Sequence, residues 1–333
     1  MPRVSGYDHG TGRHCRSAAL RNLSTFYGWG YDEPACFGFG AGLASTYAAN
    51  PETGWKVWSG VAPWLERAFF ERLEISHVER EGDEWDSAWD DVTEHLDADE
   101  PVLLFVDSAA LHYTDADHDP PHAVVAVGYD DDGVVVSDGT VDDLQELSHA
   151  ELRDAWAIDR TVSMQNRHLV VTRGRVRQDR RTAATRAVRE TAEYMLHPLD
   201  AARTTRGPGE EGLSALRSFV DDLPGLADSD EAVERADDAR RGISSHGVDA
   251  AFRGLYADAI EDLESWSHAG GDKGERMQDV ARGWRQVGGL LGDACAADDP
   301  DERAATLSEA GSVLGDVADR EEAFFEDVER ETR

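Results

Sequence analysis

Cys15 is the residue of this sequence best suited to nucleophilic chemistry. It follows Gly10-Thr-Gly-Arg-His14 and comes just before residues 16–27, whose apolar residues recur every three or four positions, as in a helix. A thiol at the start of a helix faces the positive end of the helix dipole, which stabilises a thiolate, and the backbone N–H there can stabilise an oxyanion. Arg13 and Arg16 add positive charge. We predict that Cys15 is a nucleophile; the alternative is a buried structural cysteine.

His122 and Asp138 form the second chemical feature. An apolar run starts directly after His122, another ends just before Asp138, and the turn sequence Asp130-Asp-Asp-Gly133 lies between them. In an antiparallel hairpin the start of one strand lies beside the end of the next, so we expect the two side chains to be neighbours. Asp138 would then orient the imidazole to deprotonate a thiol. The alternative for His122 is an ordinary hydrogen-bonded histidine.

The order of these residues resembles the papain-like arrangement of bacteriocin-leader peptidases, and more closely the butirosin biosynthesis protein H family. The segments that carry the resemblance are His14-Cys15-Arg-Ser-Ala-Ala-Leu20-Arg-Asn-Leu23, Tyr27-Gly28, Glu33, Phe37-Gly38-Phe39-Gly40-Ala-Gly42-Leu43, His122 and Asp138. Two later segments, Gly212–Leu216 and Ala251–Asp258, resemble the uncharacterised helical domain that commonly follows in this family.

This resemblance implies a cysteine acyltransferase of natural product biosynthesis. Such an enzyme moves a γ-glutamyl-type acyl group from an acyl carrier protein thioester to an amine, through an acyl-cysteine intermediate. Carried over, Cys15 is the nucleophile, His122 the general base and acid, and Asp138 the orienting group. The expected partners are a small-molecule or peptide-like substrate and an acyl carrier protein, and no cofactor or metal is expected.

One departure concerns the oxyanion hole. Papain-like enzymes often place a Gln before the cysteine, but the first Gln here is Gln145. The candidate oxyanion and pocket residues are instead His9, His14, Tyr7 and Glu33, with help from the backbone. Two other functions stay open: a papain-like peptidase or amidase with water as acceptor, and a non-catalytic binding module on the same fold.

Three further features of the sequence bear on chemistry. Asp115-Ala-Asp117-His-Asp119 resembles the start of a calcium loop, but Pro120 and Ala126 stand where an EF-hand needs Gly and Glu, so an acidic loop is favoured. A zinc site that joins His118 to the Cys15 and His122 region has no supporting ligand motif. Cys36, among glycines, is a second thiol for which we predict a structural role.

The elements that must position these residues differ between the two parts of the chain. Apolar runs predict strands at 102–106, 123–127, 134–136 and 168–172, and helical spacing covers 16–27, 55–73 and about 149–156, where Ser148 and Glu151 have capping-box spacing. Glycines in 36–43 indicate tight turns. Later residues show only helical spacing, over 182–196, 212–223, 230–242, 248–267, 275–294 and 301–329. We predict an α+β, papain-like domain at 1–174 and an all-α domain at 175–333.

The net charge and its distribution indicate the environment and the partners of the protein. The chain has 333 residues and a net charge of −35, yet its first 50 residues hold four basic and three acidic groups. Such an acidic coat indicates a haloarchaeal-type protein of a high-salt cell, where molar salt screens the repulsion, and it disfavours nucleic acid as a partner. With no apolar run long enough to span a membrane, no signal sequence and three widely spaced cysteines, we expect a cytoplasmic protein.

Overall fold

The chain folds into two compact units. The computed structural model describes residues 3–50, 53–114, 121–159, 163–198, 209–244, 249–264 and 272–332. One unit combines Met1–Cys36 with Leu73–Gln178, and the other combines Phe37–Arg72 with Asp179–Arg333. The predicted domains, 1–174 and 175–333, are each continuous in sequence, whereas residues 37–72 group with the later part of the chain.

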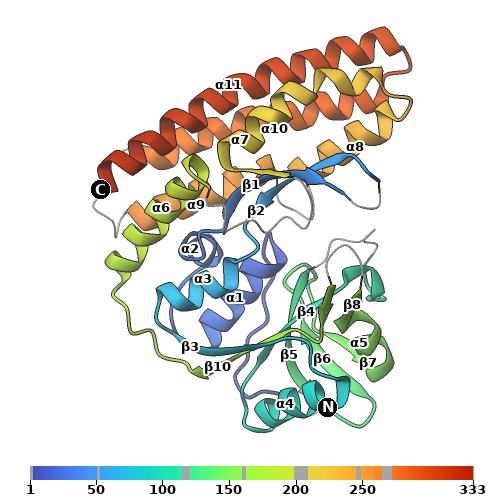
Figure 1. Ribbon diagram of the computed structural model, residues 1–333. Coiled ribbons are helices and arrows are strands. Elements are labelled where there is room, and N and C mark those ends of the chain that lie inside the picture. The colour runs from blue at the N-terminus through green and yellow to red at the C-terminus, as the bar shows by residue number, and fades with distance from the viewer. Residues whose placement is uncertain are drawn as a thin grey trace. The chain divides into compact units, whose positions relative to one another are not determined.

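An antiparallel sheet of six strands forms the centre of the first unit (Figure 1). In spatial order the strands are β3 (Ser76–Arg80), β10 (His168–Arg173), β4 (Val102–Val106), β5 (His122–Tyr129), β6 (Gly133–Ser137) and β7 (Gln145–Ser148). The apolar runs of β4, β5 and β6 are buried almost throughout, which explains why they do not alternate with polar residues. The four predicted strands are all present, and β10 lies between β3 and β4.

Helices pack against this sheet. Apolar residues of α4 (Trp85–Asp97) and α5 (His149–Trp156) form one core cluster with side chains of β4, β5 and β6. The helix α1 (Cys15–Phe26) packs against β5. Ser148 caps α5 by accepting a hydrogen bond from the backbone N–H of Glu151, as its spacing predicts. Two short elements, η1 (Ser108–Ala110) and the hairpin of β8 (Ala157–Asp159) with β9 (Ser163–Gln165), complete the described part of the unit.

The second unit is mainly helical. Its helices are α3 (Leu65–Arg72), α6 (Arg180–Leu196), α7 (Gly212–Asp222), α8 (Ala232–Ile243), α9 (Arg253–Glu264), α10 (Lys273–Ala296) and α11 (Pro300–Thr332), with the short turns η3 (Pro224–Asp228) and η4 (Ala250–Phe252). The six helices predicted after residue 180 are therefore confirmed. A small sheet of β11 (Gly209–Glu211), β1 (Leu43–Ala49) and β2 (Lys56–Val61) was not predicted for this unit.

A buried ion pair joins two of these helices. Arg253 and Glu321 have fully buried side chains and make two hydrogen bonds of 2.9 Å, and the indole N–H of Trp284 also donates to Glu321. Arg253 donates further to Ser45 and to the carbonyls of Ala44 and Ala251. Because every charged atom has partners, the cost of burying the pair is offset.

Two predicted elements were wrong. Residues 55–73 form strand β2 and then α3 rather than one helix, with Gly60 and Pro63 between the apolar groups. In the glycine-rich stretch 36–43 the first residues belong to a helix, α2 (Glu33–Phe39), and the expected turn is present only at residues 40–41. Gly38 serves close packing there, because a Cβ at this position would come within 2.8 Å of Leu263.

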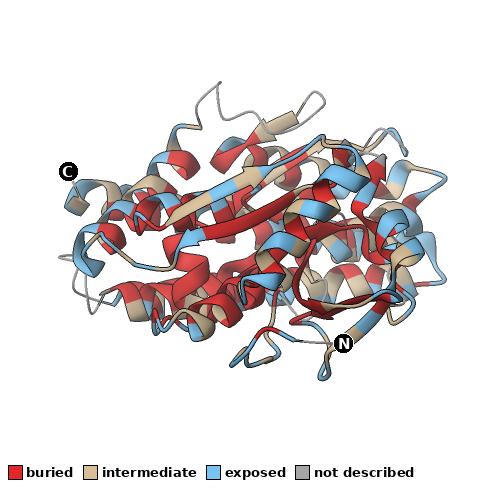
Figure 2. Cartoon of the chain, turned by 90° about the horizontal axis from the view of Figure 1, so that it is seen from below, coloured by how far each residue is buried: buried red, intermediate tan, exposed pale blue. Residues whose placement is uncertain are grey.

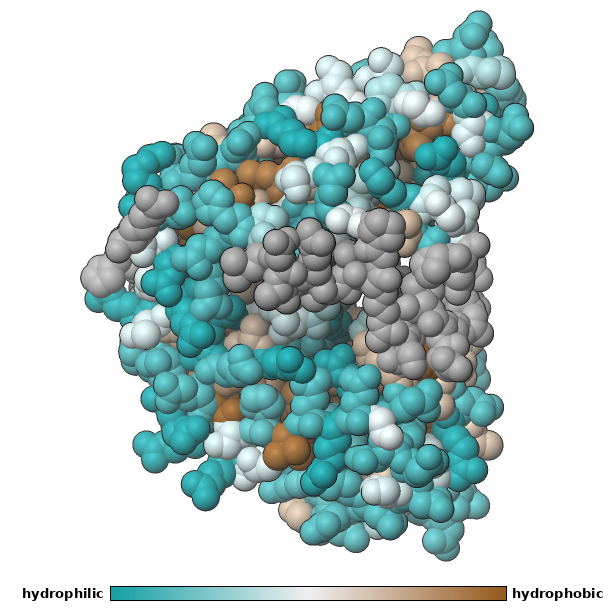
Figure 3. Space-filling view, in the orientation of Figure 1, coloured by the Kyte–Doolittle hydropathy of each residue, from teal (hydrophilic) through white to brown (hydrophobic). Residues whose placement is uncertain are grey.

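Buried residues concentrate inside the sheets and helices, whereas exposed ones lie on outer faces and connections (Figure 2). The face drawn in Figure 3 is mostly hydrophilic, with hydrophobic residues in small groups. In the described part of the chain, Val78 and Val233 are the large hydrophobic side chains that are exposed. None of the helices described combines the length and the hydropathy needed to cross a bilayer.

Candidate active site

Cys15 is the first residue of α1, and a buried carboxylate fixes the loop before it. Glu33 accepts hydrogen bonds from the backbone N–H groups of Arg13 (2.9 Å) and His14 (2.9 Å) and from the hydroxyl of Ser17 (3.0 Å). His14 is the N-cap residue, with an extended backbone. The side chains of Arg16 and Ser17 are buried, whereas Cys15 stays partly exposed. The thiol therefore lies at a helix N-terminus, accessible and firmly positioned.

His122 links Cys15 to Asp138. Its Nε2 lies 2.6 Å from Oδ2 of Asp138, and both side chains are buried. The Cys15 side chain acts on the same imidazole through its charge and a side-chain hydrogen bond. The hairpin prediction is thus correct in bringing His122 and Asp138 together. The three residues form one chain of hydrogen bonds from the thiol to a buried carboxylate.

The charges of this chain stabilise one another. Burial by itself lowers the pKa of His122, but the negative charge of Cys15 and the hydrogen bonds that the imidazole makes to Asp138 and Cys15 outweigh burial and raise that pKa to about 10. Burial raises the pKa of Asp138, yet His122 and Thr140 together bring it below its usual value. The site therefore favours a positively charged imidazole beside a buried carboxylate near neutral pH, which lets His122 act as a proton donor next to Cys15.

Two residues that the sequence analysis missed hold Asp138 in place. Oδ1 accepts from the backbone N–H (2.9 Å) and the hydroxyl (2.8 Å) of Thr140, and Oδ2 accepts from the hydroxyl of Tyr113 at 3.1 Å. The spacing Asp-Gly-Thr over 138–140 is a turn pattern that could have revealed Thr140. Nothing in the sequence around Tyr113 reveals its partner, because 25 residues separate them and the contact depends on tertiary folding.

Two glycines allow the close approach of α1 to the end of β6. The backbone N–H of Gly12 donates to the carbonyl of Gly139 at 2.8 Å. A Cβ on Gly139 would lie 2.5 Å from Cβ of Ala18, and one on Gly12 would lie 2.6 Å from Glu33. A larger residue at Gly139 would clash with α1 next to Asp138, and one at Gly12 would clash with Glu33 and Ala18, so either would disturb the packing around Cys15.

The predicted oxyanion and pocket candidates lie in two places. His14 and Glu33 are next to Cys15, but Glu33 binds the loop and N-terminus of α1, and His14 contacts Ser17 through Nδ1 (3.2 Å). Both ring nitrogens of His9 are engaged, with Ser137 (2.8 Å) and the carbonyl of Val141 (3.0 Å).

Tyr7 lies close to the His9–Ser137–Asn22 network. Burial raises the pKa of its hydroxyl, which has no hydrogen-bond partner within the described residues. Asn22 lies two turns beyond Cys15 on α1, so this network contacts the middle of the helix rather than its start. Among the described contacts, none directs His9 or Tyr7 toward the thiol.

Other sequence candidates lie elsewhere. Cys36 is fully buried, and burial together with Asp32 and Glu33 raises its thiol pKa, which makes it a poor nucleophile. The acidic segment from Asp115 to Asp119, including His118, lies outside the described residues. Within the residues that are described, no group of three or more His, Cys, Asp or Glu side chains is arranged to hold a metal ion.

Two family models match the chain. Residues 14–139 match "Butirosin biosynthesis protein H, N-terminal", and residues 150–328 match "Domain of unknown function (DUF4872)". No curated protein matches the sequence. The first match contains Cys15, His122 and Asp138, and the second covers just over half of the chain.

Proposed function

Because the chain belongs to the family in which a papain-like butirosin biosynthesis protein H N-terminal domain precedes the DUF4872 domain, we propose that it is a cysteine-dependent acyltransferase. It would move an acyl group, of the γ-glutamyl type, from a thioester to an amine. The observation that supports this proposal most strongly is the chain of hydrogen bonds from Cys15 through His122 to Asp138. A structural cysteine has no need of a buried histidine–carboxylate pair.

The first half-reaction transfers the acyl group to the enzyme. The Cys15 thiolate attacks the carbonyl carbon of the donor thioester, a new C–S bond forms, and the donor C–S bond breaks. The imidazolium of His122 gives its proton to the departing thiolate, so that a neutral thiol leaves. Asp138 keeps the ring oriented and stabilises its charged form.

The second half-reaction releases the product. Neutral His122 accepts a proton from the attacking amine, a C–N bond forms, and the bond between the acyl carbon and the Cys15 sulfur breaks to leave an amide and the thiolate. An oxyanion develops in both steps. The backbone N–H of Cys15 is suited to stabilise it, since no acceptor for this group is found among the described residues and it lies at the positive end of α1.

Intact-mass measurement tests the proposal directly. The protein, in molar KCl, would be incubated with N-acetylcysteamine thioesters that carry γ-glutamyl, aminoacyl and simple acyl groups, as stand-ins for a carrier-bound donor. We expect one acyl group to be added to the wild-type protein and to Cys36→Ala, and none to Cys15→Ala. The absence of an adduct with every donor, together with unchanged behaviour of Cys15→Ala, would favour a binding module on this fold. Equal acylation of the wild type and Cys15→Ala would show that Cys15 is not the nucleophile.

The acceptor separates transfer from hydrolysis. After acylation, addition of a primary amine should remove the adduct and yield the amide. Release of the free acid at the same rate with and without amine would identify a papain-like amidase instead. The same variants serve both experiments, because Cys36 is the matched cysteine that has no histidine partner among the described contacts.

A further inference from the structure

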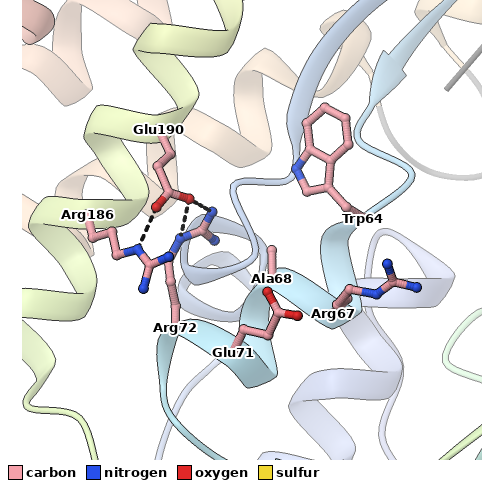
Figure 4. Close-up of a pocket in the computed structure, with 7 residues that line it drawn as sticks. All are labelled: Trp64, Arg67, Ala68, Glu71, Arg72, Arg186 and Glu190. Carbon is pink, nitrogen blue, oxygen red and sulfur yellow. Dashed lines mark hydrogen bonds and ion pairs between the residues drawn. The ribbon is translucent and has the colours of Figure 1, made fainter. Parts of the chain in front are cut away.

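The second unit contains a small cavity between α3 and α6 that acyl transfer does not use. It has a volume of about 200 Å³, and Figure 4 shows Trp64, Arg67, Glu71 and Arg72 of the α3 region facing Arg186 and Glu190 of α6. Sites for drug-sized ligands usually have roughly 300–1,000 Å³, so this cavity suits a molecule of a few heavy atoms. Three arginines and two glutamates line it, whereas acids outnumber bases two to one in the whole chain.

The charged groups on the inner side of the cavity are already hydrogen-bonded to one another. Arg72 is buried and donates to Oε2 of Glu190 from Nε (3.2 Å) and Nη2 (2.5 Å), and to the carbonyl of Phe39 from Nη1. Oε1 of Glu190 accepts from Nε of Arg186 at 2.5 Å. Two guanidinium groups thus share one carboxylate. Burial lowers the pKa of Arg72, Glu190 opposes this, and the nearby Arg186 adds to the lowering.

Two opposite charges at the cavity keep atoms that bind no described residue. In the described part of the chain, Arg186 is bonded only through Nε, which leaves the Nη1 and Nη2 fork available. Glu71 is exposed and attracts both Arg72 and Arg186 electrostatically, but no described residue forms a hydrogen bond or ion pair with its carboxylate. In Figure 4 the nitrogen-bearing edge of Trp64 faces the guanidinium groups, so the indole forms another wall.

These charges select the chemical class of a ligand. A simple anion would be attracted by Arg186 but repelled by Glu71 and Glu190, and a simple cation would be repelled by the three arginines. A molecule with both charges satisfies both sides. A guanidinium fork binds a carboxylate through two parallel hydrogen bonds, and an ammonium group binds a carboxylate and the face of an indole.

We propose that this cavity binds a small zwitterion. Its carboxylate pairs with Nη1 and Nη2 of Arg186, its ammonium group pairs with Glu71, and its carbon chain lies against Trp64. The cavity residues all belong to the second unit and Cys15 to the first, and the assignment does not depend on the acyltransferase proposal.

Calorimetric titration of the full-length protein tests this assignment. The probes are glycine, β-alanine and 5-aminopentanoate, whose two charges lie progressively further apart, with acetate and methylammonium as singly charged references. The titrations use the lowest KCl concentration at which circular dichroism shows the native fold, because salt screens the contacts. We expect at least one amino acid to bind at least tenfold more tightly than either reference.

Three variants locate the binding. Arg186→Gln and Glu71→Gln should each raise the Kd of that amino acid at least tenfold. Arg189→Gln is the matched control, because Arg189 lies on the same helix, is similarly exposed and pairs with Glu193. In this control variant the Kd of the amino acid should be unchanged. Thermal unfolding of each variant checks that it folds.

Several results would overturn the proposal. They are the absence of binding by all three amino acids, acetate binding as tightly as the best amino acid, or equal weakening in Arg189→Gln and Arg186→Gln. Binding that survives Glu71→Gln would also overturn it, since the ammonium group would then have no role.

Discussion

At the scale of single residues, His122 is the group whose charge decides what the site can do. Its pKa is raised to about 10, above the usual value of about 6.5 for histidine. The imidazolium that protonates the departing thiolate should therefore persist across neutral pH. The rate of acylation should decline only as the pH rises through about 10.

Replacement of Asp138 tests this dependence. The charge of Asp138 and its 2.6 Å hydrogen bond with His122 both raise the pKa of His122. Asp138→Asn removes the charge and changes the hydrogen bond. We expect acylation to be at least tenfold slower, and its alkaline limb to move about one pH unit or more toward neutrality. The pH profile of acyl-Cys15 formation measures both effects. A slower reaction with an unshifted limb would mean that His122 does not set the pH dependence.

The same pKa affects folding stability. A pKa raised in the folded state contributes stability that is complete below about pH 6.5 and is lost as the pH rises through about 10. Urea unfolding at pH 7 and at pH 10.5 should show this loss in the wild type. In Cys15→Ala the loss should be smaller, because the charge that most raises the pKa of His122 is gone. Equal losses in the two proteins would contradict the linkage.

Replacement of Tyr113 tests how the Asp138 carboxylate controls the pKa of His122. Its hydroxyl and Nε2 of His122 both bind Oδ2 of Asp138, at 3.1 Å and 2.6 Å. In Tyr113→Phe the carboxylate loses one donor and should interact more strongly with His122, so the alkaline limb should move to higher pH, opposite to Asp138→Asn. Acylation should be modestly slower, because Asp138 is less well positioned. A purely structural role for Tyr113 predicts slower acylation with no shift of the limb.

At the scale of elements, the N-terminus of α1 depends on a side chain from the start of α2. Glu33 accepts hydrogen bonds from the backbone at residues 13 and 14 and from Ser17, and it is buried. Glu33→Gln should lower the free energy of unfolding by about 2 kcal/mol, since hydrogen bonds to a charged acceptor are lost and a buried amide N–H group faces other donors.

Urea unfolding of matched variants checks this expectation. Glu94→Gln makes the same chemical change on the exposed surface of α4 and should alter the free energy of unfolding by less than about 0.5 kcal/mol. Equal effects of the two substitutions would show that Glu33 has no special role. Acylation of Glu33→Gln should also slow, because the position of Cys15 depends on this loop.

At the scale of the whole molecule, net charge dominates. With 68 acidic and 33 basic residues, repulsion opposes the compact state unless salt screens it. The Debye length falls from about 10 Å at 0.1 M salt to about 3 Å at 1 M. We expect the Tm to rise over this range of KCl and to continue rising toward 3 M. A Tm that stays constant or falls would argue against adaptation to high salt.

Much of the structure follows from local patterns. The strands 102–106 and 134–136, the cap at Ser148 and the long C-terminal helices depend on apolar spacing and on neighbours in sequence, and all are present. The segment 55–73 is not the single helix predicted, because the spacing of Trp58 and nearby apolar residues fits a helix and a strand equally. Strand β2 exists through its pairing with β1, which a single segment does not reveal.

For the candidate site, residue types and short-range order were enough to predict the chemically competent groups: a thiol before a helix, and a histidine and an aspartate at adjoining ends of a hairpin. Three features required the three-dimensional fold: His122 lies between Cys15 and Asp138, Tyr113 and Glu33 hold the partners, and residues 37–72 join the helical unit. These contacts link residues far apart in sequence, and their geometry is set by packing, which no local pattern contains.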